Sequence, residues 1–327
     1  MVTDAPPAAT TEPPRQDSKS LVRGIIKTVR PHQWAKNAFV IAPMFFNKAL
    51  IFTAPNGVAG LNLSVSGRAL AGMFVFCLLA GAVYTINDLV DVEADRVHPV
   101  KRARPIAAGI VPERIAKMVA AALVVVSLAF SLRIDIWFAA VALAYFVENI
   151  LYSFWLKKVA YLDVGLIALG FVLRVIAGGL ATRTHVSNYM YGCTLLLALY
   201  LGFGKRRHEL GSEKAGKQRA ALDSYSKGAL NGALAITGIL TVVTYVAYTL
   251  DPATREFFHS DWLWVTAPMT AFGIGRFYQL VSSKTAKAAK AESPTQAMLS
   301  DVPFVLNVFL WVVIVATLVY RLRPSAS

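Results

Sequence analysis

Residues 87–105 of this 327-residue chain read NDLVDVEADRVHPVKRARP, and they follow directly on an uninterrupted apolar run at 69–86. That run approaches the roughly 20 residues that an α-helix needs to cross a bilayer. Acidic side chains, and then basic ones, come where such a helix leaves the membrane. The stretch therefore predicts a membrane-spanning helix with a charged site at its end.

The composition extends this prediction to the whole chain. Hydrophobic residues make up 56% of the sequence and charged residues 16%, and the mean hydropathy is +0.52. A soluble domain carries about a quarter charged residues, so these values are typical of a chain embedded in lipid. We predict an all-α polytopic membrane protein, a bundle of about nine transmembrane helices. The expected spans are 37–53 (interrupted by Pro43 and Lys48), 69–86, 115–132, 136–156, 159–182, 188–204, 229–250, 261–280 and 302–320.

The basic residues predict the orientation of this bundle. A net charge of +14 would suggest nucleic acid as the partner of a soluble protein. Here most Lys and Arg residues fall in alternate connections, and cytoplasmic connections carry such an excess. We expect a multi-pass protein of the plasma (inner) membrane with no nucleic-acid partner, its N-terminus and site cytoplasmic and its C-terminus external. The inner segments are then 1–36, 87–114, 157–158, 205–228 and 281–301.

The predicted domain organisation is one transmembrane catalytic domain at 37–321 with short flanking segments. Residues 1–18 are expected to be a disordered cytoplasmic tail, and residues 322–327 a short external tail. Residues 19–36 form an amphipathic juxtamembrane segment. This segment either lies on an anionic leaflet or is a solvated helix that leads into the membrane.

Four oxygen-bearing side chains fall on one face of the helix that leaves the membrane after 86. Like-charged carboxylates one helical turn apart repel each other unless a cation lies between them. Such hard oxygen ligands, completed by water and substrate phosphates, suit Mg²⁺. The predicted metal ligands are Asn87, Asp88, Asp91 and Asp95.

Two basic clusters lie at predicted cytoplasmic ends. Beside a carboxylate-held metal, Lys101, Arg102 and Arg104 predict a diphosphate clamp, because Arg makes bidentate contacts to phosphate. The second cluster follows four spans later, a spacing that suggests duplication of a four-helix unit. It contains Lys205, Arg206 and Arg207, followed by Glu209.

Further polar residues near the inner surface are candidates for the same site. Lys36 and Asn37 are assigned to the diphosphate. Asp163 and Arg174 lie three helical turns apart on one face, and charged groups at membrane depth usually face the bundle interior. A structural Asp–Arg or Glu–Lys pair and a catalytic role both stay open. The supporting residues are Arg30, Glu148, Tyr152, Lys157, Asp163, Arg174 and Glu209.

The pattern Asn87-Asp88-x-x-Asp91-x-x-x-Asp95 with His98-Pro-x-Lys101-Arg102-x-Arg104-Pro105 resembles the first signature of the UbiA superfamily of intramembrane prenyltransferases. Tyr152-x-x-x-x-Lys157 is similar to the Tyr/Lys element before its fifth helix. The resemblance covers roughly residues 30 to 320 and implies a UbiA-like helical bundle that binds a magnesium diphosphate.

The second signature departs from the common pattern. Most superfamily members carry a second Asp-rich motif after helix six, where this chain has Lys205 to Leu210. This basic version resembles the decaprenyl-phosphate phosphoribosyltransferase branch of actinobacteria, as does Arg30-Pro-x-x-Trp34-x-Lys36-Asn37. That branch implies phosphoribosyl pyrophosphate as the donor, a polyprenyl (decaprenyl) phosphate as the acceptor, and a product for cell-wall arabinan. Lys205, Arg206 and Arg207 would then hold either the donor 5-phosphate or the acceptor phosphate.

Two other functions stay open on the sequence. One is transfer of a prenyl group from its diphosphate to an aromatic or quinone-precursor acceptor, against which the basic second motif argues. The other is transport of an anionic lipid or metabolite, which predicts broken helices at corresponding positions of two halves. Isoprenoid length, metal number and the presence of a homo-oligomer are not determined by the sequence.

Overall fold

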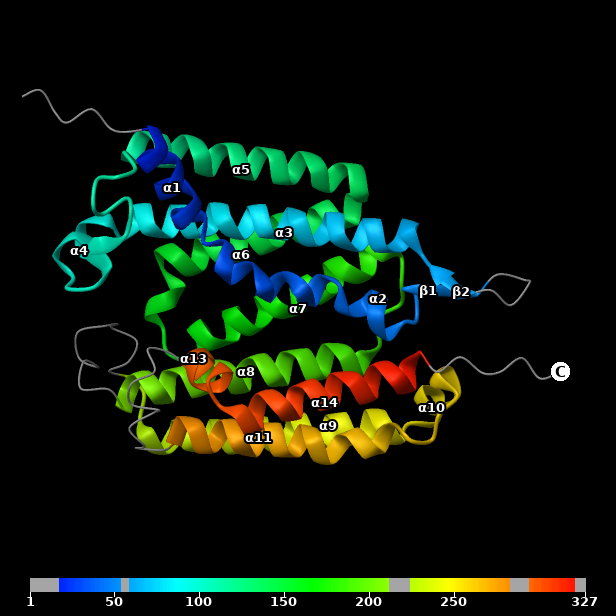
Figure 1. Ribbon diagram of the computed structural model, residues 1–327. Helices are drawn as coiled ribbons and strands as arrows, with labels where there is room; N and C mark the ends of the chain where they lie inside the picture. Colours follow the sequence, from blue (N-terminus) through cyan, green and yellow to red (C-terminus); the bar gives the residue numbers. More distant parts are fainter. Residues whose placement is uncertain (1–17, 54–58, 212–223, 283–293, 321–327) are drawn as a thin grey trace, which may run out of the picture.

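The fold is built almost entirely from α-helices, which confirms the predicted class. The computed structural model describes residues 18–53, 59–211, 224–282 and 294–320. In Figure 1, α3, α5, α6 and α7 lie together as one group, and α8, α9, α11 and α14 form a second group. Helices α7 and α8 pack against each other and join the two groups. The long helices are α3 (Leu63–Val90), α5 (Glu113–Ile134), α6 (Ile136–Phe154), α7 (Leu162–Thr182), α8 (Asn188–Gly211), α9 (Lys227–Leu250), α11 (Ala267–Ser282) and α14 (Val302–Val319).

Short elements connect the long helices. One antiparallel hairpin pairs β1 with β2 and places Ile51 opposite Leu61. The short elements are α1 (Ser18–Val29), the 3₁₀ helix η1 (Pro31–Val40), α2 (Ala42–Phe46), β1 (Ile51–Thr53), β2 (Ala59–Leu61), α4 (Val92–Val97), η2 (Lys101–Ala103), η3 (Leu156–Lys158), α10 (Pro252–Phe258), η6 (Leu263–Thr266) and α13 (Pro294–Leu299).

Six helices in the described part of the chain are long and apolar enough to cross a membrane: α3, α5, α6, α7, α9 and α14. Each coincides with a predicted span. The predicted span 188–204 lies within α8, whereas 261–280 is divided between η6 and α11. Of the nine predicted spans, six therefore correspond to described helices that are long and apolar enough to cross a membrane.

The first predicted span, 37–53, is wrong as a continuous helix. Helix α1 ends before Pro31, because a proline ring disfavours α-helical backbone at the residue before it. Arg30 instead takes a left-handed conformation with φ of 57°. The chain then continues as η1 and α2, and it turns into the β-hairpin after Phe46. Pro43 lies at the start of α2, where its missing N–H is not needed.

Helix α7 holds this irregular segment through a glycine. A Cβ atom at Gly178 would lie 2.1 Å from the carbonyl oxygen of Val40, so only glycine permits this approach. Asn37 and Val40 are buried on the same face of η1. The close approach therefore fixes where η1 lies relative to the rest of the bundle.

The amphipathic helix α1 is only partly covered by protein. Leu21 and Ile25 pack against the buried cluster of Val92, Ile106, Val111 and Ala116. Val22 and Ile26, on the same helix, remain 56% and 55% exposed. The tails predicted at 1–18 and 322–327 lie outside the described residues, apart from Ser18.

Candidate active site

The acidic segment keeps its helical phase although α3 ends at Val90. Backbone hydrogen bonds run from the Asp91 amide to Asn87 and from the Asp95 amide to Asp91, at 3.0 and 2.8 Å. The predicted register across 87–95 is therefore present, with Asp91 as the junction between α3 and α4. Asp88 and Asp95 are buried, whereas Asp91 is partly exposed.

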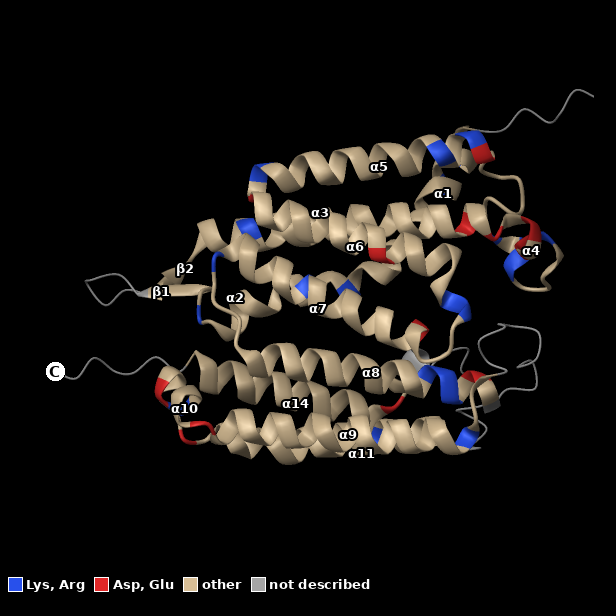
Figure 2. Cartoon of the chain, turned by 180° about the vertical axis from the view of Figure 1, so that it is seen from behind, with Lys and Arg blue, Asp and Glu red and all other residues tan. Residues whose placement is uncertain are grey.

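Arginines from two distant segments meet the two buried carboxylates. Arg30 donates to Asp88 at 2.5 Å and stacks over Tyr84. Arg104 donates to Asp88 at 3.1 Å and to Asp95 at 2.6 Å, and the Lys101 ammonium lies 4.0 Å from Asp95. Figure 2 shows these charges gathered at the α4 end of the molecule. This end of the site is an alternating network of carboxylates and cations.

Asp91 has a different partner. The Lys157 ammonium, from the connection between α6 and α7, donates to both carboxylate oxygens at 2.8 and 3.0 Å. This pair joins the acidic segment to the connection between α6 and α7. Asp91 is the most accessible of the three aspartates.

The donor set fits a hard cation, although the carboxylates are not gathered into one cluster. In the described ranges, no three His, Cys, Asp or Glu side chains come together as a metal site. Arginine and lysine side chains pair with the carboxylates instead, and Asp88 pairs with two arginines. Asn87, Asp91 and Asp95 supply oxygen only, without thiolate or imidazole, which suits Mg²⁺ completed by phosphate oxygens.

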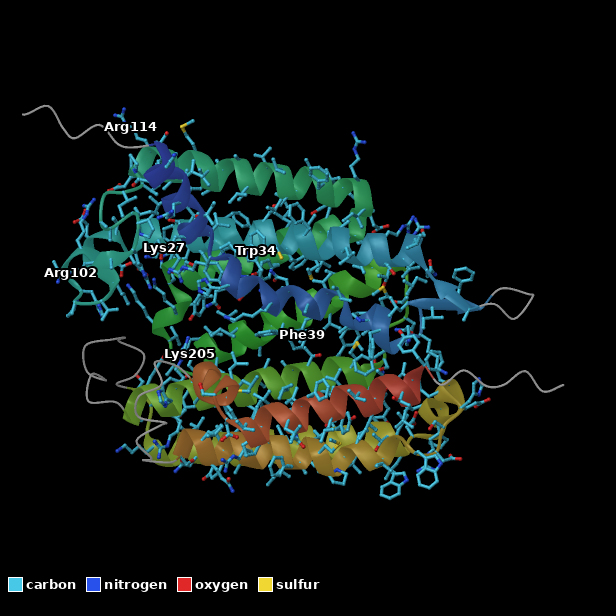
Figure 3. The ribbon with its side chains drawn as sticks, viewed as in Figure 1. Lys27, Trp34, Phe39, Arg102, Arg114 and Lys205 are labelled. Carbon is cyan, nitrogen blue, oxygen red and sulfur yellow. The ribbon has the colours of Figure 1, made fainter. Side chains whose placement is uncertain are left out.

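Arg102 and His98 belong to the same segment as Lys101 and Arg104 but take no part in the ion pairs described above. Arg102 is exposed, and Figure 3 shows it at the outer tip of the connection after α4. The His98 imidazole Nδ1 accepts from the backbone amides of Val100 and Lys101, at 3.2 Å each. His98 therefore shapes the turn that carries the basic residues.

Arg174 does not pair with Asp163, contrary to one of the two alternatives. Its guanidinium donates to Asn37 at 2.8 Å, to the Tyr145 hydroxyl at 2.8 Å and to the Gly170 carbonyl. Asn37 is buried and donates to the Cys77 thiol. Arg174 thus ties η1, α6 and α7 together, because a helical arginine three turns from Asp163 finds closer acceptors on neighbouring elements.

Glu148 is likewise not paired with the lysines after α6. It is buried and accepts from the side chain of Asn149 at 2.7 Å. Lys157 pairs with Asp91 instead. The Glu–Lys alternative is therefore wrong for Glu148, since the chain turns in η3 and directs Lys157 toward α3.

The second basic cluster is divided between the interior and the surface. Arg206 is almost wholly buried and forms ion pairs with Asp163, at 2.7 Å, and with Glu209. Arg207 donates to Asn231 of α9 at 2.8 Å. Lys205 is exposed and lies in the space between the two helix groups (Figure 3). Lys205 is therefore the cluster member with a side chain open to a ligand.

Tyr225 completes the network around Asp163. Its hydroxyl donates to the Asp163 carboxylate at 2.6 Å and accepts from the Tyr161 amide at 2.6 Å. Tyr161 has a positive φ of 66°, an uncommon conformation for a tyrosine. Tyr152 is half-buried. No sequence spacing pointed to Tyr225, because it lies 62 residues from its partner.

An apolar cavity of about 760 Å³ lies between η1, α2 and the second helix group. Phe39 on η1 and Leu201 on α8 line it toward one end. Tyr245, Tyr248 and Trp311 line it further along. The cavity follows the helices for much of their length, since it also reaches Asn188 at the start of α8 and Thr254 in α10.

Comparison with known proteins decides the family. Residues 42–293 match the UbiA prenyltransferase family. The chain belongs to this family. Its similarity to UbiA proteins of known structure extends over most of its length. The UbiA homologue from Archaeoglobus fulgidus, solved with GPP and Mg²⁺, superimposes with a TM-score of 0.64 at 18% identity, covering 90% of this chain and 99% of that one.

Curated UbiA relatives share more of the sequence. Decaprenyl-phosphate phosphoribosyltransferase of Mycolicibacterium smegmatis is 38% identical over 236 residues, 72% of each chain. The enzyme of the same name from Corynebacterium glutamicum is 32% identical over 311 residues, 94% of this chain and 90% of that one. The predicted resemblance to this branch is confirmed.

Proposed function

We propose that the chain transfers 5-phosphoribose from phosphoribosyl pyrophosphate to a polyprenyl phosphate such as decaprenyl phosphate. The products are diphosphate and a lipid-linked phosphoribose, a precursor for cell-wall arabinan. The observation that carries the proposal is the second cluster. Where a prenyl-diphosphate enzyme has acids, this chain has a basic run whose Lys205 is exposed, which suits an additional phosphate group.

The donor diphosphate is assigned to the α3–α4 end of the site. Asn87, Asp91 and Asp95 would hold Mg²⁺, which supplies charge neutralisation to the leaving diphosphate. Lys101, Arg104 and Lys157 already lie against these carboxylates and present N–H donors to the same space. Asp88 holds Arg30 and Arg104 in place, because both guanidiniums converge on one of its oxygens.

The reaction needs little proton transfer. The bond between the ribose anomeric carbon and the diphosphate breaks, and the electron pair leaves with the diphosphate. A phosphate oxygen of the lipid forms the new bond from the opposite face. Because this acceptor is already an anion, no strong general base is required, and the donors around the diphosphate stabilise the charge that develops there.

The apolar cavity is the proposed site of the isoprenoid chain. Its lining is dominated by aromatic and aliphatic side chains, and it runs along α8 away from Lys205. The site is placed on the cytoplasmic face of the plasma membrane, because α4 and the end of α8 carry the basic connections. The N-terminus is then cytoplasmic and the C-terminus external.

A direct assay tests the function. Purified protein is incubated with polyprenyl phosphate, Mg²⁺ and ribose-labelled phosphoribosyl pyrophosphate, and the organic phase is analysed. Labelled lipid that appears only with both substrates supports the proposal. Absence of labelled lipid, together with transfer from a prenyl diphosphate to an aromatic acid, would establish the alternative function.

A further inference from the structure

The 3₁₀ helix η1 presents three distinct faces because residues three apart eclipse each other. Trp34, Asn37 and Val40 form the face that packs inward, and the last two are buried. Phe39 lines the apolar cavity, and Lys36 lies three residues, or one 3₁₀ turn, before it. Lys36 therefore projects from the cavity face of η1, just beyond the first residue of η1 that lines the cavity.

Helix α8 repeats this arrangement on the opposite wall. Leu197 and Leu201 line the cavity, and Lys205 follows Leu201 by four residues. Residues four apart share a face of an α-helix. Lys205 thus lies one turn beyond the last residue of α8 that lines the cavity, at the same end as Lys36.

The surroundings of Lys36 are cationic. Lys36 is accessible to solvent, but desolvation by the surrounding protein and the positive charges of Lys205, Arg174 and Arg30 lower its pKa to about 8. Lys205 has Glu209 at 4.0 Å, and Arg174 and Arg30 donate to Asn37 and Asp88. Two ammonium groups, each one helical turn beyond a residue that lines the apolar cavity, indicate a site for an anion that carries an apolar chain.

We propose that Lys36 and Lys205 together hold the phosphate of the lipid acceptor, with its isoprenoid chain in the cavity beyond Phe39 and Leu201. This inference rests on the proposed function, and it replaces the assignment of Lys36 to the diphosphate. The donor diphosphate is already met by Arg104, Lys101 and Lys157 around the acidic segment. The acceptor oxygen would approach the donor from the side of η1 and α8.

The test separates lipid binding from catalysis. Wild-type protein and the variants Lys36→Gln, Lys36→Arg and Lys117→Gln are purified in detergent. Lys117 is the control, because it is an exposed lysine on α5, outside the site. Binding of geranylgeranyl phosphate and of uncharged geranylgeraniol is measured without donor, by microscale thermophoresis, and unfolding temperatures verify that each variant is folded.

The expected result is specific to the phosphate. Lys36→Gln weakens binding of geranylgeranyl phosphate at least tenfold and leaves geranylgeraniol binding unchanged, whereas Lys36→Arg and Lys117→Gln bind both as the wild type does. In the transferase assay, Lys36→Gln raises the KM for polyprenyl phosphate tenfold and changes the KM for phosphoribosyl pyrophosphate less than twofold.

Two results would overturn the inference while the function stands. One is transfer by the wild type with unchanged lipid-phosphate binding in Lys36→Gln. The other is a raised KM for phosphoribosyl pyrophosphate alone, which would place Lys36 at the donor. Conversely, Lys36-dependent binding of geranylgeranyl phosphate without any phosphoribosyl transfer would support the inference and reject the proposed function.

Discussion

Arg104 lies between the carboxylates of Asp88 and Asp95, and it joins two residues that a helix places two turns apart. At this scale the site is a set of carboxylates that are paired with arginine and lysine side chains. The arginine is positioned by two acids and keeps further N–H donors for phosphate. The accessible acid, Asp91, has only the Lys157 ammonium as its partner among the ion pairs that the structure describes.

Asp91 and Asp88 should therefore respond differently to the same substitution. Asp91→Asn removes a metal-binding charge from a partly exposed pair, so we expect at least about a 100-fold loss of kcat with less than about 1 kcal/mol of stability lost. Asp88→Asn breaks a buried pair and should cost about 3 kcal/mol. Breaking a buried ion pair costs roughly 3–5 kcal/mol. We expect the lower end of that range, because the Arg30 and Arg104 side chains keep 22% and 27% of their surface exposed. Turnover and thermal unfolding of the two variants, measured side by side, check this; equal stability losses would contradict it.

The pH dependence of acceptor use should report Lys36. Its pKa is lowered to about 8, so the cation is present below that pH and is lost as the pH rises through it. The kcat/KM for polyprenyl phosphate, which reports the free enzyme, should fall as the pH rises through 8 and level off about tenfold lower, near the value of Lys36→Gln. In Lys36→Arg the guanidinium stays protonated, so the decline should disappear. An unchanged alkaline decline in Lys36→Arg would exclude Lys36 as its source.

Individual residues were predictable where the partners are close in sequence. Asp88, Asp91, Asp95, Lys101 and Arg104 lie within one short stretch, and the structure brings them to one place. The partner of Arg206 was not predictable, because Asp163 lies on a different helix and only packing of α7 on α8 joins them. A basic run in sequence does not show which of its members faces inward.

Among the elements, η1 determines most about the site, since it carries Asn37 on its inward face and Lys36 and Phe39 on its cavity face. Its conformation was missed from the sequence. An apolar composition suits a helix in lipid, but Pro31 and Pro43 interrupt its hydrogen bonding and leave a 3₁₀ segment between them. The six regular spans were predictable because an apolar run of that length in lipid has to satisfy its backbone as a helix.

The contact of η1 with α7 gives a prediction for two glycines of the same helix. Gly178→Ala places a Cβ 2.1 Å from the Val40 carbonyl oxygen, so η1 must move, at a cost of about 3 kcal/mol. Gly165 has no atom within 4 Å of an added Cβ, and Gly165→Ala should stabilise by about 0.5–1 kcal/mol.

Thermal unfolding and the KM for polyprenyl phosphate measure both glycine effects. Only Gly178→Ala should raise this KM, because Phe39 moves with η1. Similar unfolding temperatures for the two variants would show that η1 is not held at Gly178.

On the scale of the whole molecule, the apolar cavity lies between η1, α2 and the second helix group, and the charged network lies at the α4 end of the molecule. The orientation of this arrangement in the membrane is open to a labelling test. In a background with Cys77 and Cys193 replaced by alanine, Arg133→Cys, in the last turn of α5, should react with an impermeant maleimide on intact cells. Arg102→Cys, after α4, should react only after lysis. Labelling with the reverse pattern would place the acidic segment outside the cell.

The central claim is that the diphosphate leaves a soluble sugar and not a lipid. The most direct measurement uses phosphoribosyl pyrophosphate with ³²P in the 5-phosphate in one reaction and in the β-phosphate in another. With polyprenyl phosphate and Mg²⁺, the 5-phosphate label should enter the lipid product and the β-phosphate label should be released as diphosphate. Asp91→Asn should strongly reduce both. Label that stays in the aqueous substrate in both reactions, with diphosphate released only from an added prenyl diphosphate, would contradict the account.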